Sequence, residues 1–339
     1  MNRTVFGLDL AKHVFQLHWV EMATGEICRR QLKRHQVAEF FTNRVPGIIA
    51  MEACGSAHHW GRKFAALGHE VRLIAGQFVR PFVKSNKTDA ADGQAIWEAA
   101  QRPGMKFVAL KTEEQQSVLT LHRIREQLVK IRTMQVNQLR GLLYEFGADL
   151  PQGRQRGLAR VGEALALLEG KLSAMVIEVI RDQLRRIETL DEDIAGLEKK
   201  LVLWKKQDEA SKRLLEIPGV GLLTATAVVA TIGNAKAFKS GREFAAFLGL
   251  VPRQSGTGGR VKLLGISKRG DVYLRTLLIH GARAVIQHQK EPTPWLKKLL
   301  LRRPHNAVVV ALANKMARTI WALLAHDRRF DRNYAANTA

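Results

Sequence analysis

The alternation of apolar and polar positions over the first hundred residues predicts short strands and helices in a definite order. Residues 4–10 form an apolar run with a carboxylate where the run ends. Residues 14–22 alternate apolar and polar side chains, as a half-buried strand does, and residues 26–33 return after a turn. The region is completed by a helix (36–43), a strand (48–51), a helix (57–67), a strand (70–74) and a last helix that ends near Gln101.

This order of three strands, helix, strand, helix, strand and helix is that of the ribonuclease H fold. Carboxylates stand at the ends of its elements. Asp9 ends the first strand, Glu52 follows the fourth, and Asp89 and Asp92 lie in the first turns of the last helix. Strands one and four are neighbours in that fold, so we expect Asp9 and Glu52 side by side. The i, i+3 spacing puts Asp89 and Asp92 on one helical face.

Four carboxylates gathered at one place would suit Mg²⁺, which prefers oxygen ligands, and two such ions about 4 Å apart clamp a phosphodiester during in-line displacement. Each residue alone also has an ordinary interpretation. Asp89 suits a helix N-terminus because of the helix dipole, and Glu52 suits a surface. Their combination at convergent element ends favours a metal site. His58 and His59 are adjacent on a helix, point in different directions and are not predicted as ligands.

From residue 113 to 206 the apolar positions recur every three or four residues within a charged surface, which predicts long helices. The repeats favour an antiparallel coiled-coil pair joined by a looser connection over residues 147–157, and two ordinary packed helices are the alternative. The region is predicted to be a scaffold and a place for dimerisation, because it carries no catalytic pattern. Its repeating positions are Leu121, Ile124, Leu128 and Ile131, then Leu190, Ile194, Leu197, Leu201 and Trp204.

Residues 214–221 and the apolar run 222–232 have the pattern of a helix-hairpin-helix. Gly219 and Gly221 allow a tight turn and let backbone N–H groups approach a phosphate at the start of the second helix. Such a unit binds the nucleic-acid backbone without reading bases. A simple helical turn is the alternative, and the basic surroundings favour phosphate contact.

Residues 251–260 combine three glycines with basic and amide side chains around Ser255. A glycine-rich basic loop lets a phosphate approach its backbone closely. Serine in such a loop is usually a turn residue, but its hydroxyl is also a candidate nucleophile that would need activation. Further helices are predicted over 272–287, with Arg275 on its outer face, and over 295–301 and 307–324. The basic residues of the loop region are Arg253, Arg260, Lys262, Lys268 and Arg269.

Charge is concentrated in the C-terminal part. The chain has 339 residues and a net charge of +23, of which residues 211–339 contribute +16 from 22 basic and 6 acidic side chains. This asymmetry favours a polyanionic partner, usually nucleic acid, over a generic solubility surface. Cys28 and Cys54 make no disulfide framework and suit a reducing cytoplasm, and we expect neither a signal peptide nor a membrane span.

Five segments carry a resemblance to a known family. The sequence resembles the DEDD-type insertion-sequence transposases of the IS110 family, most closely its IS1111 branch, over nearly the whole chain. The matching segments are Gly7–Lys12, Met51–Ser56, Lys87–Asp92, Ile217–Gly221 and Ser255–Gly259.

The resemblance implies an α/β plus α architecture. It implies an RuvC-like ribonuclease H domain, a helical coiled-coil region, a mainly helical C-terminal transposase domain and a tail, over residues 1–112, 113–208, 209–332 and 333–339. It implies Mg²⁺ on Asp9, Glu52, Asp89 and Asp92, and a transient covalent link between Ser255 and DNA. Lys12 and Lys87, inside the matching segments, join the two glycines and the loop cations as nucleic-acid contacts.

The same resemblance implies donor and target double-stranded DNA and a structured guide RNA encoded by the element as partners. Because the serine and the carboxylates lie in different predicted domains, we also expect a composite site shared between the subunits of a homodimer or homotetramer, in the cytoplasm of a bacterium, near the nucleoid. We therefore expect a transposase that cuts and rejoins DNA by serine attack. Two alternatives remain open: a metal-dependent junction nuclease that uses water, and a non-catalytic nucleic-acid-binding protein.

Overall fold

The computed structural model describes residues 3–83 and 89–331, and it describes the backbone but not the side chains of Asp89 and Ala90. The chain divides into two compact units. Unit 1 comprises Met1–Gln115 with Ile232–Ala237, and unit 2 comprises Gln116–Thr231 with Phe238–Ala339. Each unit is considered by itself below.

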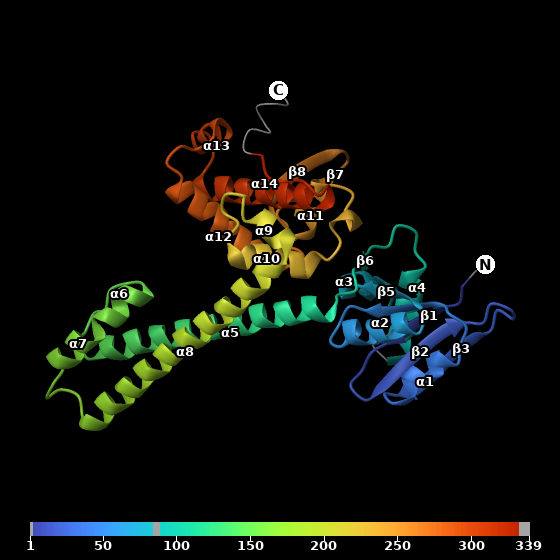
Figure 1. Cartoon of the computed structure of the whole chain (residues 1–339), viewed down its shortest axis with the longest axis horizontal. Coiled ribbons are helices and arrows are strands. Elements are labelled where there is room, and N and C mark those ends of the chain that lie inside the picture. The colour runs from blue at the N-terminus through green and yellow to red at the C-terminus, as the bar shows by residue number, and fades with distance from the viewer. Residues whose placement is uncertain (1–2, 84–88, 332–339) are drawn as a thin grey trace. The chain divides into compact units, whose positions relative to one another are not determined.

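Unit 1 is built on a six-stranded mixed sheet with the strand order β3-β2-β1-β4-β5-β6 (Figure 1). The predicted order of elements is confirmed, with a short helix and a 3₁₀ turn added before the last helix and β6 added after it. Strand β1 pairs antiparallel with β2 and parallel with β4, as a ribonuclease H-like fold requires. The strands are β1 (Val5–Asp9), β2 (Val14–Val20), β3 (Ile27–Lys33), β4 (Ile48–Glu52), β5 (Glu70–Ile74) and β6 (Phe107–Val108).

Helices cover the two faces of this sheet. One face packs against α1 (Gln36–Thr42) and α2 (Ala57–Ala66), and its core includes Phe6, Leu8 and Phe41. The other face packs against α4 (Asp89–Ala100), which contacts β1 and β2. Because side chains alternate along a strand, Phe6 and Leu8 point to the first face and Gly7 to the second. The short α3 (Gly76–Val79) and a 3₁₀ turn (Arg80–Phe82) precede α4.

Gly7 allows α4 to lie close against β1. A side chain there would place its Cβ 2.6 Å from Cβ of Trp97 and would also collide with the carbonyl of Gly93. Further along the helix direction, Gln101 lines a cavity together with Val5 and Ile48, which begin β1 and β4. Helix α4 therefore runs antiparallel to β1, and its N-terminus lies toward the end of β1 that carries Asp9.

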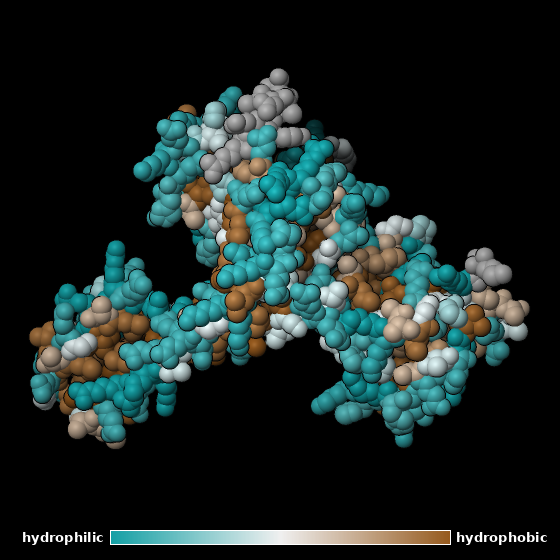
Figure 2. Space-filling view, in the orientation of Figure 1, coloured by the Kyte–Doolittle hydropathy of each residue, from teal (hydrophilic) through white to brown (hydrophobic). Residues whose placement is uncertain are grey.

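In unit 2, two long helices lie side by side, α5 (Glu113–Glu145) and α8 (Ala174–Gln207), as the apolar repeats predict (Figure 1). The segment between them contains α6 (Arg154–Ala159) and α7 (Val161–Leu167), so part of the predicted loose connection is helical. Figure 2 shows apolar residues exposed around this end of the pair. Leu167, the last residue of α7, is 79% exposed.

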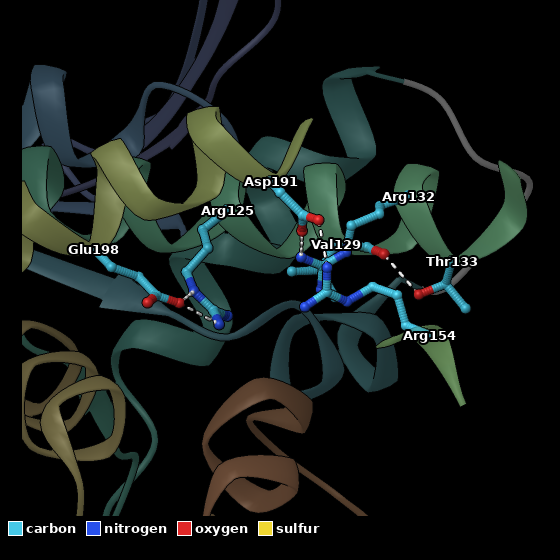
Figure 3. A network of polar contacts seen from close by, with 7 residues as sticks. All are labelled: Arg125, Val129, Arg132, Thr133, Arg154, Asp191 and Glu198. Carbon is cyan, nitrogen blue, oxygen red and sulfur yellow. Dashed lines mark hydrogen bonds and ion pairs between the residues drawn. The ribbon is translucent and has the colours of Figure 1, made fainter. Parts of the chain in front are cut away.

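Polar contacts join the long helices (Figure 3). Arg125 of α5 donates from Nε to the carboxylate of Glu198 on α8 at 2.7 Å. Asp191 of α8 accepts from both Arg132 of α5 and Arg154 of α6, so one carboxylate ties three helices together.

The rest of unit 2 is mainly helical. Its helices are α9 (Glu209–Leu214), α10 (Leu222–Ile232), α11 (Gly241–Phe247), α12 (Val272–His288), α13 (Pro294–Leu300) and α14 (His305–Ala325). The 3₁₀ turn that follows α10, Ala235–Ala237, belongs to unit 1. Strands β7 (Pro252–Thr257) and β8 (Arg260–Ile266) form an antiparallel hairpin. Helix α14 is long and apolar enough to span a membrane, but a single such helix is weak evidence for a membrane span, because the core helix of a folded domain has the same composition. In unit 2, α14 packs against α9, α11, α12 and α13.

Candidate active site

Asp9 and Glu52 occupy matching positions at the ends of two neighbouring parallel strands. Leu8 of β1 pairs with Met51 of β4, and Asp9 and Glu52 are the next residue on each strand. Alternation places Asp9 on the face of Gly7, and Glu52 on the face of Ala50, which packs into the core beneath α4. Both carboxylates are half-buried. The predicted juxtaposition is therefore present in the fold.

The pKa of the Cys54 thiol is affected by the negative charge at this edge of the sheet. Loss of hydration around its thiol raises the pKa, and the carboxylates of Glu52 and Asp9 raise that pKa further, although the residue as a whole remains exposed. A thiol influenced by both carboxylates must lie near both of them. Sequence reasoning gave Cys54 no role at this edge, and its place two residues after Glu52 was the available signal.

The other two predicted carboxylates belong to the start of α4. Asp89 is the first residue of this helix, and its side chain lies outside the described residues. Asp92 follows one turn later and is half-buried. Because α4 runs antiparallel to β1, its first turn lies toward the edge where Asp9 and Glu52 end their strands.

The donor set fits a hard divalent cation. Carboxylate oxygens are the side-chain ligands that Mg²⁺ prefers, and three or four of them at one strand edge would be mutually repulsive without a cation. Among the described side chains, no group of three or more His, Cys, Asp or Glu residues is close enough to hold one ion. Asp9, Glu52 and Asp92 thus lie toward the same edge of the sheet, on the face that α4 covers, but their side chains do not converge on one metal position.

Ser255 lies on strand β7, in register with Lys262 of β8, and is exposed. The expectation of an irregular glycine-rich loop is wrong here, because only Gly258 and Gly259 make the turn and both have positive φ. Every residue of β7 is exposed, so the strand lacks the one-sided apolar pattern by which a strand is recognised. Among the described residues, no carboxylate or imidazole hydrogen-bonds to the hydroxyl of Ser255.

The predicted cations surround this serine along the hairpin. Arg253 lies on β7, and Arg260 and Lys262 lie on β8, all of them exposed. Lys268 and Arg269 follow β8 directly and are exposed as well. In unit 1, Lys12 is exposed just beyond β1, and Lys87 lies outside the described residues.

The two glycines of the turn between α9 and α10 have different surroundings. Gly219 has φ +84° and packs against α12, where an added Cβ would lie 2.8 Å from the carbonyl of Gly281 and from Val285. Gly221 is exposed, and nothing lies near the position of an added Cβ. Gly219 therefore serves the packing of the turn, and Gly221 is the one accessible to a ligand.

Arg275 contradicts its predicted outer position on α12, because it is only 7% exposed. Its guanidinium donates to the carbonyl of Leu248 at 2.9 Å and to that of Arg269 at 3.0 Å. The side chain thus fixes the segment that follows the serine hairpin. Its partners are distant in sequence, so no local pattern could have revealed them.

Two family models match the chain. One, described as a transposase and named for the DEDD type of the IS110 group, matches residues 6–147. The other is described as the transposase IS116/IS110/IS902 family and matches residues 211–298. The first match contains the carboxylate edge, and the second contains the serine hairpin.

Several transposase sequences are similar over almost the full length. A probable family 20 transposase of Pseudomonas aeruginosa is 50% identical over 96% of this chain and 98% of its own. The transposase for insertion sequence element IS1111A of Coxiella burnetii is 44% identical over 96% and 91%. The transposase for insertion sequence element IS1328 of Yersinia enterocolitica is 40% identical over 98% and 99%.

Proposed function

Because the chain belongs to the IS116/IS110/IS902 family of transposases, an enzyme family that acts on DNA, we propose that it cuts and rejoins DNA through Ser255 with the help of Mg²⁺. The observation that carries the proposal is the carboxylate edge of the ribonuclease H-like sheet, which we propose to be an RuvC-like domain. Asp9 and Glu52 end adjacent parallel strands on the face that α4 covers, and the first turn of α4 lies toward the same edge.

In this proposal Asp9, Glu52, Asp89 and Asp92 hold Mg²⁺ through their carboxylate oxygens. When bound, the ion neutralises the scissile phosphate and lowers the barrier to displacement at phosphorus. The half-burial of Asp9 and Glu52 reduces competition from water.

Ser255 is the proposed nucleophile. Its hydroxyl gives up its proton to water as Oγ bonds to phosphorus, while the bond from phosphorus to one sugar oxygen breaks and that oxygen takes up a proton from water to become a hydroxyl end. Attack by a second hydroxyl end on the serine phosphodiester restores the DNA backbone and frees the serine. Lys262, across the hairpin, and Arg253, two residues before the serine on β7, provide positive charge for the phosphate.

The serine and the carboxylates belong to different units, and in this proposal both act on the same phosphate as a composite site. A composite site suits a dimer or tetramer whose subunits each contribute part of it, and the long helices α5 and α8, as a coiled coil, are the proposed scaffold. We further propose that the turn at Gly221 is the phosphate-contacting part of a helix-hairpin-helix. The proposed structured guide RNA would choose the DNA sites by base pairing, as in other RNA-guided systems.

A junction nuclease that uses water is the second candidate. It is favoured by the exposed hydroxyl of Ser255, to which no carboxylate or imidazole among the described residues is hydrogen-bonded. In that reaction Ser255 would be structural, and cleavage would leave no protein–DNA bond.

A covalent-adduct assay separates the two candidates. Wild type and Ser255→Ala are incubated with Mg²⁺, the RNA encoded beside the gene and junction DNA, and a protein–DNA species that survives denaturation is sought. Thr257→Ala, two residues along the same exposed strand, is the matched control for damage to the hairpin.

We expect the adduct in wild type and Thr257→Ala and its complete loss in Ser255→Ala. Cleavage without an adduct in all three proteins would establish the water-using nuclease. DNA binding with neither cleavage nor an adduct in any of them would support the non-catalytic binding protein.

A further inference from the structure

Three arginines of unit 1 lie over aromatic rings on the side of the sheet away from α4. The guanidinium of Arg44 is 4.4 Å from the ring centre of Phe40 and 4.9 Å from that of Trp19. Arg30 is 5.4 Å from Phe40. Arg34 is 5.4 Å from Trp60. We call this set, Arg30, Arg34 and Arg44 with Trp19, Phe40 and Trp60, the arginine–aromatic surface.

These arginines differ from three other arginines of unit 1 in what their N–H groups contact. Arg3 and Arg72 both pair with Glu70, and Arg62 pairs with Glu113. Within the described residues, Arg30, Arg34 and Arg44 have no carboxylate within ion-pair distance. Figure 2 shows mainly hydrophilic side chains over the part of unit 1 that carries α1. The positive charge there is thus uncompensated by the protein.

The local charge is strongly one-sided. Between residues 27 and 64 there are seven Lys and Arg residues and two Asp and Glu residues. One of the two acids is Glu52, which points to the opposite face of the sheet. The surface therefore matches a polyanion rather than an acidic or apolar protein segment.

Stacking prepares a guanidinium to bind phosphate. A ring covers one flat face of the group and holds it in place, while the N–H groups at its edge remain directed outward. An arginine held in this way loses less conformational entropy when it makes a bidentate contact with a phosphate. Three such groups on one surface provide a fixed array of donors.

The array has a length that suits a nucleic-acid strand. Arg34 lies by Phe15 and Arg44 by Trp19, four residues apart on β2, which is about 13 Å at 3.3 Å per residue. A strand of duplex DNA presents one phosphate per about 3.4 Å of axis, so the array extends over roughly four phosphates.

We propose that the arginine–aromatic surface binds the phosphate backbone of duplex DNA, without reading its sequence, on the face of the sheet opposite the carboxylate edge. The inference rests on the proposed function for the presence of DNA and adds a second place where DNA is held. Two simpler roles compete with it. Charged residues on the edge strand β3 discourage pairing with other chains, and stacking stabilises the fold.

The test is the salt dependence of binding to a labelled duplex of arbitrary sequence, about 30 base pairs long, measured by fluorescence anisotropy between about 50 and 200 mM salt. The test variant carries Arg30→Gln, Arg34→Gln and Arg44→Gln. The control variant carries Arg3→Gln, Arg72→Gln and Arg102→Gln. It removes the same charge from the same unit, and two of its arginines stack on Phe107 and Phe82.

The slope of log K, the logarithm of the DNA association constant, against log salt is negative. We expect its magnitude to decrease by about 2.7 in the test variant, which is 0.9 for each lost phosphate contact. The affinity near 0.1 M salt should fall by two to three orders of magnitude. The control variant should stay close to wild type. If the test variant unfolds, a second variant with lysine at the three positions replaces it. Lysine retains the charge without the planar fork, so the slope should stay and the affinity should fall about 10-fold.

Equal slopes and affinities in the test and control variants would overturn the inference and leave the edge-strand and stacking roles. Loss of affinity for a structured RNA of the same length, with duplex DNA binding unchanged, would overturn it as well. Both results would leave the serine adduct untouched, so failure of this inference is distinguishable from failure of the proposed function.

Discussion

At the scale of single residues, the candidate active site is positioned by the side-chain periods of strand and helix. Alternation along β1 and β4 turns Asp9 and Glu52 to the face that α4 covers, and Gly7 lets the helix approach that face closely. The direction of α4 then brings its first turn toward the same edge. The raised pKa of the Cys54 thiol is consistent with negative charge collecting there.

Replacing Asp9 by Asn should remove the stabilisation that Mg²⁺ gives to the wild-type protein. At a Mg²⁺ concentration about 100 times its Kd, binding to the folded state alone stabilises it by about 2.7 kcal/mol. Without metal, the same change relieves repulsion between neighbouring carboxylates. We therefore expect Asp9→Asn and Glu52→Gln to be at least as stable as wild type in a chelator and less stable than wild type in Mg²⁺. Thermal unfolding with and without the ion measures both differences.

Glu39→Gln, on the exposed surface of α1, is the control for this experiment and should keep the full response to Mg²⁺. An unchanged response in both Asp9→Asn and Glu52→Gln would show that the metal is held elsewhere.

At the scale of elements, one carboxylate holds the connecting helix α6 against the two long helices. Asp191 of α8 bonds Arg132 of α5 and Arg154 of α6, and all three side chains are partly buried (Figure 3). Asp191→Asn keeps the shape but leaves two guanidinium groups without their counter-charge. We expect a loss of about 1–2 kcal/mol, less than for a fully buried pair, and faster hydrogen exchange in α6 and α7.

Asp182→Asn is the matched control on the same helix. Its partner Arg185 is three residues away and both side chains are exposed, so its loss should change stability by less than about 0.5 kcal/mol and leave exchange in α6 unaltered. Equal effects of the two changes would contradict the role of Asp191.

The same scale explains which elements could be predicted from the sequence. The strands β1 to β5 and the long helices have apolar positions at a regular period because one face of each is buried, and these were predicted correctly. The hairpin β7–β8 has no buried face along β7, so its sequence resembles that of a loop. Arg275 is held by carbonyls of Leu248 and Arg269, contacts that depend on folding rather than on local pattern. The shared edge of the acids was predictable, whereas their side-chain conformations were not.

At the scale of the whole molecule, charge and burial are distributed unequally. Residues 211–339 carry +16 of the total +23, in the part of the chain that holds the serine hairpin. Within unit 2, the long helix α5 is joined to the C-terminal helices by a buried polar cluster. His122 of α5 is 1% exposed, with Nδ1 2.9 Å from the hydroxyl of Tyr273 on α12 and Nε2 3.0 Å from the hydroxyl of Thr226 on α10.

The hydrogen bonds of this cluster determine the tautomer of His122. The Thr226 hydroxyl donates to the carbonyl of Leu222 at 2.8 Å, so its oxygen accepts from Nε2–H of the imidazole. Nδ1 is then unprotonated and accepts from the Tyr273 hydroxyl. Burial, with a smaller effect of the Arg125 charge, lowers the pKa of His122 to about 4. Protonation would place a second donor opposite the Tyr273 hydroxyl and a charge in the interior.

The stability of unit 2 should therefore fall as the pH is lowered. The unfolded chain takes up a proton at His122 near pH 6.5, whereas the folded chain does so only near pH 4, so the contribution is complete above 6.5 and lost progressively between 6.5 and 4. A pKa difference of this size corresponds to on the order of 3 kcal/mol. In His122→Gln the glutamine can keep one hydrogen bond but cannot titrate. Scanning calorimetry of wild type and His122→Gln should therefore show a difference in stability that changes with pH. His280→Gln, at an exposed position of α12, is the control. A stability difference between wild type and His122→Gln that does not change with pH would show that His122 is protonated equally in the folded and the unfolded chain.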